Sequence, residues 1–339
     1  MNTLAFSRWI ILLFLLATLF VLNLSLGSVT IPFRDILSIL AGKESLEPAW
    51  TDIVWDFRMT KALTCFLAGG ALSVSGLQMQ TLFRNALVGP DVLGLSSGAS
   101  LAVSLVMLSQ SAGLSIMTFP GAWTVVAASS MGCVFVFLIM LTISQRLHDN
   151  VSLLLVGLMI GAGTASIVSV LQYLSKAEDL QIFVIWTFGS LGSLNWTEIK
   201  IMAIILVIGV SIAFGSIKSL NAWLLGENYA RSMGINITRS RLLIIVSTSI
   251  LTGSVTAFCG PLAFVGLAVP HLIKLLIKTN NHKVLIPAVL IGGAILMLFC
   301  DMLAQLPGST QVLPINAITA LIGAPIVIWV IMRNKKISV

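Results

Sequence analysis

The chain has 339 residues, of which 58% are hydrophobic and only 9% are charged, and its formal net charge is +7. About a quarter of the residues of a soluble domain are charged, so one protein core cannot hide this much apolar surface and lipid must solvate part of it. The composition therefore excludes a soluble globular protein.

Long uncharged runs predict the membrane spans. The runs cover residues 9–33, 62–83, 92–145 and 151–175. One span needs roughly 20 apolar residues, so the run 92–145 must hold two helices, with a turn at 109–121. The first run is longer than the roughly 7–15 residues of a signal-peptide core, which favours a retained helix.

Continued along the chain, the pattern predicts ten spans, centred near residues 17, 70, 101, 132, 163, 208, 249, 268, 292 and 322. The seventh and eighth must fold back on each other at Gly260-Pro261. The loops are short, so we expect one all-α transmembrane domain over residues 1–339 and no separate soluble domain.

The basic residues predict the orientation. With both termini in the cytoplasm, 13 of the 19 Lys and Arg residues lie on the inner side and most acidic residues lie outside. This follows the positive-inside rule and supports an even number of spans. The net positive charge thus reflects membrane topology rather than a nucleic-acid partner. The inner basic residues are Arg8, Arg84, Arg146, Lys218, Arg231, Arg239, Arg241, Lys274, Lys278, Lys283, Arg333, Lys335 and Lys336.

No metal, cofactor or catalytic site is expected. The four cysteines, Cys65, Cys133, Cys259 and Cys300, fall inside predicted spans without a C-x-x-C pair. His148, His271 and His282 have no carboxylate or thiol at ligand spacing. The phosphate-binding sequence G-x-x-x-x-G-K-[ST] does not occur either.

Three segments between spans are long enough to carry structure. Residues 36–40, outside, favour a short interfacial helix, and residues 183–189, also outside, favour a half-helix at the membrane surface. The third segment, 218–241, is cytoplasmic. Its Leu225, Tyr229 and Met233 would form one face of a short helix that ends at Gly234.

In the same cytoplasmic helix, Glu227 and Arg231 stand four residues apart and can form an ion pair. The pattern leaves two interpretations open. The helix lies on lipid headgroups, or it docks a cytoplasmic partner.

Small residues crowd the second, third and fifth spans, among them Gly157, Gly161 and Ser166, which are candidates for a translocation path. Close helix packing explains such residues equally well. Gly89-Pro90 and Gly260-Pro261 form a faint echo in spans of opposite orientation, a pattern found in inverted-repeat transporters.

Asp301 is the one acidic candidate for an intramembrane ion site, placed near the outer end of the ninth span, where water or a helix end can stabilise its charge. A carrier driven by protons or sodium usually needs a buried acid. The energy source is therefore expected outside this chain.

Several landmarks together resemble the FecCD-type permeases, the membrane subunits of ABC importers for ferric siderophores, haem and cobalamin. The resemblance covers nearly the whole chain in the family's order. The matching segments are 58–61 (Arg-Met-Thr-Lys), 68–80, 84–87, 94–99, 225–227, 234–235, 264–271 and 320–325.

The resemblance implies a type II ABC importer permease of the bacterial inner membrane, with ten helices per subunit. It forms a homodimer or a dimer with a related permease, and it binds two cytoplasmic ATPases and a periplasmic or lipid-anchored binding protein. It also implies that the ATPase-coupling residues are Leu225, Gly226, Glu227, Tyr229, Ala230, Met233 and Gly234. Arg58 and Lys61 match basic residues that dock the binding protein.

Three positions depart from the family pattern. Ala86 replaces a proline, Gln305 stands where an arginine often follows Asp301, and Val312 stands where a glutamate usually precedes Leu313-Pro314. The loss of the proline relaxes the backbone restriction on Asn85, and the changes at Gln305 and Val312 put docking on the outer face in doubt. The sequence thus favours an importer permease that works by alternating access. Its rivals are an ion-coupled secondary transporter that uses Asp301 and a membrane protein without transport activity.

Overall fold

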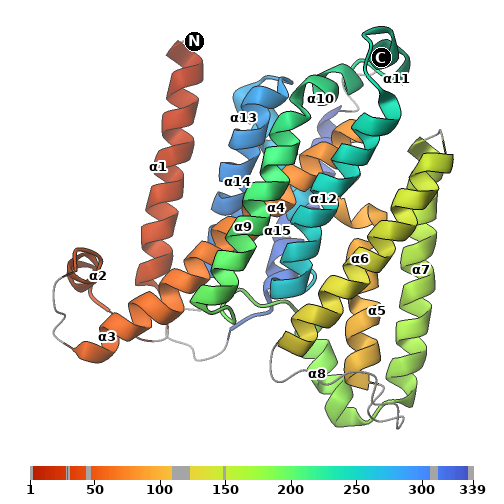
Figure 1. The fold of residues 1–339 in the computed structure, drawn as a ribbon. Helices are drawn as coiled ribbons and strands as arrows, with labels where there is room; N and C mark the ends of the chain where they lie inside the picture. The colour runs from red at the N-terminus through yellow and green to blue at the C-terminus, as the bar shows by residue number, and fades with distance from the viewer. Residues whose placement is uncertain are drawn as a thin grey trace.

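The computed structural model describes residues 3–27, 29, 31–42, 47–108, 123–147, 150–305 and 312–334. The described chain is helical, and its only β-pairing is one isolated bridge between Gln305 and Val312. The long helices form a slanted bundle, with α1 at one side and α5–α8 at the other (Figure 1).

The helices, in chain order, have the following bounds. They are α1 Thr3–Ser25, α2 Phe33–Leu40, α3 Pro48–Asp52, α4 Thr60–Leu82, α5 Leu95–Leu108, α6 Trp123–Arg146, α7 Asn150–Leu174, α8 Ala177–Thr187, α9 Trp196–Gly215, α10 Ile217–Trp223, α11 Glu227–Ser232, α12 Ile237–Cys259, α13 Val265–Ile277, α14 His282–Ala304 and α15 Ile315–Asn334. A π-helix, η1 Ile53–Met59, joins α3 to α4, and a 3-10 turn, η2 Pro90–Leu93, precedes α5.

A helix lies at each of the ten predicted span positions. Within the described residues, 7 helices are long and apolar enough to cross a membrane, and shorter apolar helices, α5, α13 and the part Ile315–Val330 of α15, lie at the remaining three predicted places. The predicted surface helices are α2 and α8, and α12 ends at Cys259, directly before Gly260-Pro261. The predicted turn at 109–121 lies outside the described residues.

The second span differs from the prediction at its outer end. The helix runs without a break from Pro48 to Leu82, 35 residues, although Asp52, Asp56, Arg58 and Lys61 fall within it. The predicted second span stops at these charged residues, because an unpaired charge is costly in lipid. Here Arg58 donates to backbone carbonyls and Lys61 pairs with an acid, so the helix continues through them.

α4 lies at the centre of the bundle, packed against α14, α12, α13 and α9. Glycines allow these close approaches. A Cβ atom on Gly76 would lie 1.8 Å from the carbonyl oxygen of Gly266, and one on Gly69 would lie 2.2 Å from that of Gly293. Two pairs of small residues thus bring α4 into backbone contact with α13 and α14.

Two short helices, α5 and α13, lie toward opposite ends of the bundle (Figure 1). In Figure 1, α5 lies toward the end of the molecule that carries α8, whereas α13 lies toward the end that carries α10 and α11. Gly94 and Gly260 have positive φ values of 75° and 78°, which let the chain turn sharply before each short helix. A Cβ atom on Gly266 would lie 2.7 Å from Pro90 Cδ, so Pro90 of the first Gly-Pro pair packs against the first turn of α13.

Candidate coupling and transport sites

The cytoplasmic segment presents an exposed apolar face. Leu225, Tyr229 and Met233 are 61%, 48% and 60% exposed, while Ala230 between them is fully buried. Gly226 and Gly234, with φ values of 108° and 79°, lie on either side of the six-residue helix α11. The helix is shorter than the predicted face, because Leu225 precedes it and Met233 follows it. In Figure 1, α10 and α11 lie at the end of the bundle where α1 begins.

The same segment is anchored to the membrane domain. The predicted ion pair between Glu227 and Arg231 is present, with an N–O distance of 3.1 Å. Trp223 is fully buried and its indole Nε1 donates to Ser240 Oγ at the start of α12, at 2.9 Å. Sequence reasoning missed Trp223, because an isolated tryptophan near a membrane surface usually lies in the headgroup layer.

On the outer side, Arg58 is only 7% exposed. Its Nη1 donates to the carbonyl oxygens of Leu24 and Ser25, and its Nη2 donates to that of Val29. The guanidinium therefore ties the start of the second span to the last turn of α1 and to Val29 after it. Its role in docking stays a prediction, and in this structure the side chain serves internal contacts.

Lys61 is engaged as well. Its Nζ lies 2.9 Å from Asp301 Oδ1 and 2.9 Å from Gln305 Oε1. Asn23 Nδ2 donates to the other carboxylate oxygen of Asp301 at 2.7 Å. The polar cluster of Asn23, Lys61, Asp301 and Gln305 therefore joins α1, α4 and α14.

The predicted environment of Asp301 was wrong. We expected water or a helix end to stabilise its charge, but the residue is only 2% exposed and its partners are Lys61 and Asn23. Gln305 and Val312 are two of the departures from the family pattern. Gln305 accepts a hydrogen bond from Lys61, whereas the side chain of Val312 is 60% exposed. Three members of the cluster, Lys61, Asp301 and Gln305, form part of the wall of an outer cavity of about 600 Å³.

The path candidates of α7 have three different environments. Gly157 is buried, and a Cβ atom there would lie 2.1 Å from the carbonyl oxygen of Val92. Gly161 is half-buried beside Ser97, and Ser166 is exposed. Their assignment to a translocation path stays a prediction. Gly157 is also needed for the close packing of α7 against η2.

A cavity rich in hydroxyl groups lies beside Gly161, between α5, α7 and α8, with a volume of about 410 Å³. No charged side chain lines it. Its lining is Ser96, Ser97, Ser100, Thr164, Ala165, Val168, Ser169, Gln172, Phe183, Thr187 and Pro261. Such a wall offers weak, uncharged contacts that suit passage better than tight binding.

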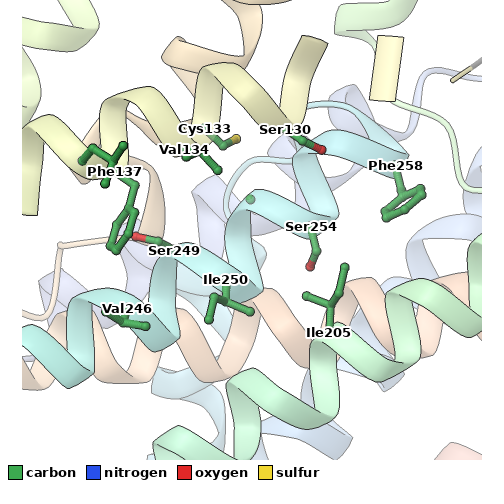
Figure 2. Close-up of a pocket in the computed structure, with 12 residues that line it drawn as sticks. Ser130, Cys133, Val134, Phe137, Ile205, Val246, Ser249, Ile250, Ser254 and Phe258 are labelled. Atoms are coloured by element: carbon green, nitrogen blue, oxygen red, sulfur yellow. The ribbon is translucent and has the colours of Figure 1, made fainter. Parts of the chain in front are cut away.

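A second cavity, of about 320 Å³, is almost wholly apolar and lies between α6, α9 and α12 (Figure 2). Figure 2 shows Phe137, Ile205 and Ile250 around it, together with Ser249 and Ser254. The Ser249 hydroxyl has no hydrogen-bond partner. With no charged group in its wall, this cavity matches lipid chains rather than a charged chelate.

Within the described residues, no group of three or more His, Cys, Asp or Glu side chains could hold a metal ion, and the four cysteines are free and buried. His148 lies outside the described residues. His271 Nε2 donates to the carbonyl oxygen of Ala86 at 2.7 Å, and His282 contacts Thr81 and Asn221.

Comparison with known proteins adds the following. The sequence profile of the FecCD transport family matches residues 14–333. The hemin transport system permease protein HmuU of Yersinia pestis is 31% identical over 326 residues, which are 96% of this chain and 95% of that protein. The vitamin B12 import system permease protein BtuC of Salmonella typhimurium is 31% identical over 316 residues, 91% of this chain and 94% of that protein.

A solved structure is also similar. An inward-facing conformation of a metal-chelate type ABC transporter superposes with a TM-score of 0.83 at 26% sequence identity, covering 98% of this chain and 100% of the other. PsaBC from Streptococcus pneumoniae shares the fold more distantly, with a TM-score of 0.53 and 14% identity over 80% of this chain and 90% of the other.

Proposed function

The chain belongs to the FecCD transport family and is a multi-pass permease of the bacterial inner membrane, and we propose that two copies of it, driven by two cytoplasmic ATPases, import a metal chelate. The substrate class is a large iron or cobalt chelate, such as haem, a ferric siderophore or cobalamin. The names of the similar permeases, for hemin and vitamin B12, support this class.

The exposed apolar face of 225–233 carries the proposal. Leu225, Tyr229 and Met233 are exposed on the cytoplasmic segment, while Trp223 of the same segment is buried and hydrogen bonded to Ser240. A rigid segment with an exposed apolar face is suited to dock a partner, because little conformational freedom is lost on binding. We assign this surface to the ATPase, and the adjoining Gly226, Glu227, Ala230 and Gly234 to holding its shape.

The second subunit is assigned to the side of α7. Only 22% of the apolar stretch of α7 is buried, against 89% for the helix that contains α4. Gly163 and Ser166 are exposed on α7, and small residues in a membrane helix favour a protein neighbour over lipid. The hydroxyl-rich cavity lies against the same helix, so we propose that substrate passes between two copies of this region.

The direct test is uptake into proteoliposomes that contain the permease, its ATPase and its binding protein. We expect haemin or cyanocobalamin to accumulate only when ATP is supplied on the ATPase side, with no response to an imposed proton or sodium gradient. Uptake that follows a gradient without ATP would replace this function with secondary transport.

The outer basic residues are proposed to contribute to binding-protein docking, with Lys61 as the residue to test. Lys61 is 17% exposed at the mouth of the outer cavity, so a carboxylate of the binding protein could compete with Asp301 for it. Charges at the edge of an interface chiefly set the association rate and its salt dependence.

The double substitution Lys61→Gln with Asp301→Asn removes the cation together with its internal partner. We expect the binding protein to associate about threefold to tenfold more slowly at low salt, with a flatter salt dependence, measured by surface plasmon resonance on folded permease. Lys200→Gln, which removes an exposed outer cation, is the control. An unchanged association rate in the double variant would restrict Lys61 to an internal role.

A further inference from the structure

Arg241, in the first turns of α12, makes contacts that the ATPase-docking role does not account for. The residue is only 5% exposed, although it lies at the cytoplasmic end of the helix among the basic residues that set the topology. Burying a guanidinium is costly unless it is paired and hydrogen bonded. The contacts of this side chain therefore indicate what it holds together.

One side of the guanidinium contacts the coupling segment. Nη2 lies 3.4 Å from Glu227 Oε2 in α11. The guanidinium carbon lies 5.9 Å from the ring centre of Trp223, the last residue of α10. Arg241 thus contacts the coupling segment both before and after Gly226, where the chain turns.

The other side of the guanidinium contacts a different part of the chain. Nη1 donates to the carbonyl oxygen of Leu147 at 2.8 Å. Leu147 directly follows α6, and α7 begins at Asn150. Arg241 is therefore a bridge between the coupling segment and the end of α6, three residues before α7 begins.

We propose that Arg241 is a positioning residue that transmits movement of the coupling segment to the end of α6 and, through the chain that continues from Leu147, to the start of α7. The inference rests on the proposed function, because it assumes that the ATPase moves this segment. Along the chain, about 80 residues and four helices separate Leu147 from Glu227. Through Arg241, the two are linked by one side chain. When the ATPases close, α11 and the start of α7 move together.

A planar guanidinium is suited to linking the coupling segment to another part of the chain. It presents several N–H groups in fixed directions, so it can hold a carboxylate and a carbonyl at once while it stacks on an aromatic ring. Lysine keeps the charge but not the fork, and glutamine loses both. The three residue types therefore separate the effect of charge from the effect of geometry.

The test measures the distance between spin labels on Ser232, exposed at the end of α11, and Val151, exposed at the start of α7. The sample is the permease–ATPase complex in lipid nanodiscs, with and without ATP and vanadate. In the complex without other changes, we expect one narrow distance that nucleotide does not alter. In Arg241→Gln, we expect nucleotide to shift or broaden the distance distribution between the two labels. In Arg241→Lys, we expect a smaller change of the same kind.

A second measurement is the nucleotide hydrolysed for each haemin or cyanocobalamin molecule imported. Arg241→Gln is expected to raise this ratio about tenfold, within the usual range of coupling between sites. ATPase binding is expected to be kept, since Leu225, Tyr229 and Met233 are intact. Arg239→Gln, two residues away on the same helix and exposed, is the matched control and should change neither readout.

Three results would overturn the proposal. They are a label distance in Arg241→Gln as narrow and fixed as before, equal broadening in Arg239→Gln, and a parallel loss of ATPase binding and uptake at constant hydrolysis per substrate. If Arg241→Gln does not fold, the same criteria apply to Arg241→Lys. Failure of the proposed function is a different outcome, because the unsubstituted permease would then bind no ATPase.

Discussion

Replacing Tyr229 and Met233 together with alanine is expected to remove the ATPase from the purified complex while the permease still inserts normally. Both side chains are about half exposed or more in the isolated subunit, so truncation leaves the subunit itself little changed. Apolar anchors at the centre of an interface often contribute about 1–3 kcal/mol each. Together they correspond to a loss of affinity of at least about thirtyfold.

The measurement is the ratio of ATPase to permease after affinity purification, with the permease tagged. The matched control is Leu13→Ala with Phe14→Ala, two apolar residues, 51% and 72% exposed, on α1, which lies across the bundle from α11 in Figure 1. A full complement of ATPase with the double variant at 229 and 233 would show that this surface contacts lipid headgroups instead.

Local sequence pattern predicted the spans well for a physical reason. Each span must satisfy its backbone hydrogen bonds internally and present an apolar surface, so its signal is contained within about 20 consecutive residues. The short helix around Tyr229 was likewise visible, because residues four apart share a face and glycine ends a helix. These features need no knowledge of the rest of the chain.

Contacts between distant segments could not be predicted in this way. Lys61 and Asp301 are 240 residues apart, and only the packing of α4 against α14 brings them together. The same holds for Arg241 and Leu147, and for the backbone contact of Gly76 with Gly266. The sequence showed that these residues were charged or small, but not which partner each would meet.

Asp301→Asn is expected to destabilise the permease strongly. The same substitution at a water-exposed carboxylate would have little effect on stability. The substitution leaves the Lys61 ammonium, only 17% exposed, without its counter-charge. Breaking a buried ion pair by removing one partner typically costs about 3–5 kcal/mol, because the remaining charge is left uncompensated. Lys61→Gln should lower the stability by a similar amount, since within the described residues the Asp301 carboxylate would then keep only Asn23 as a side-chain hydrogen-bond donor.

The double variant, Lys61→Gln with Asp301→Asn, should recover most of the loss, because two amides can hydrogen bond with no buried charge. The measurement is the fraction of folded, monodisperse permease after a heating series in detergent, for the four members of this cycle. Single losses that simply add in the double variant would show that the two groups do not interact. Lys200→Gln again controls for removal of an outer cation.

The same cycle also tests the role of Asp301 in transport. In an ATP-driven importer, Asp301 serves to hold α4 and α14 together through Lys61, so at saturating binding protein the double variant should retain most ATP-dependent uptake per folded complex. In an ion-coupled carrier, the carboxylate itself binds the ion, and no substitution of Lys61 could restore its function. Recovery of stability together with uptake in the double variant would therefore assign Asp301 a structural role. Recovery of stability without uptake would indicate that the carboxylate takes part in transport.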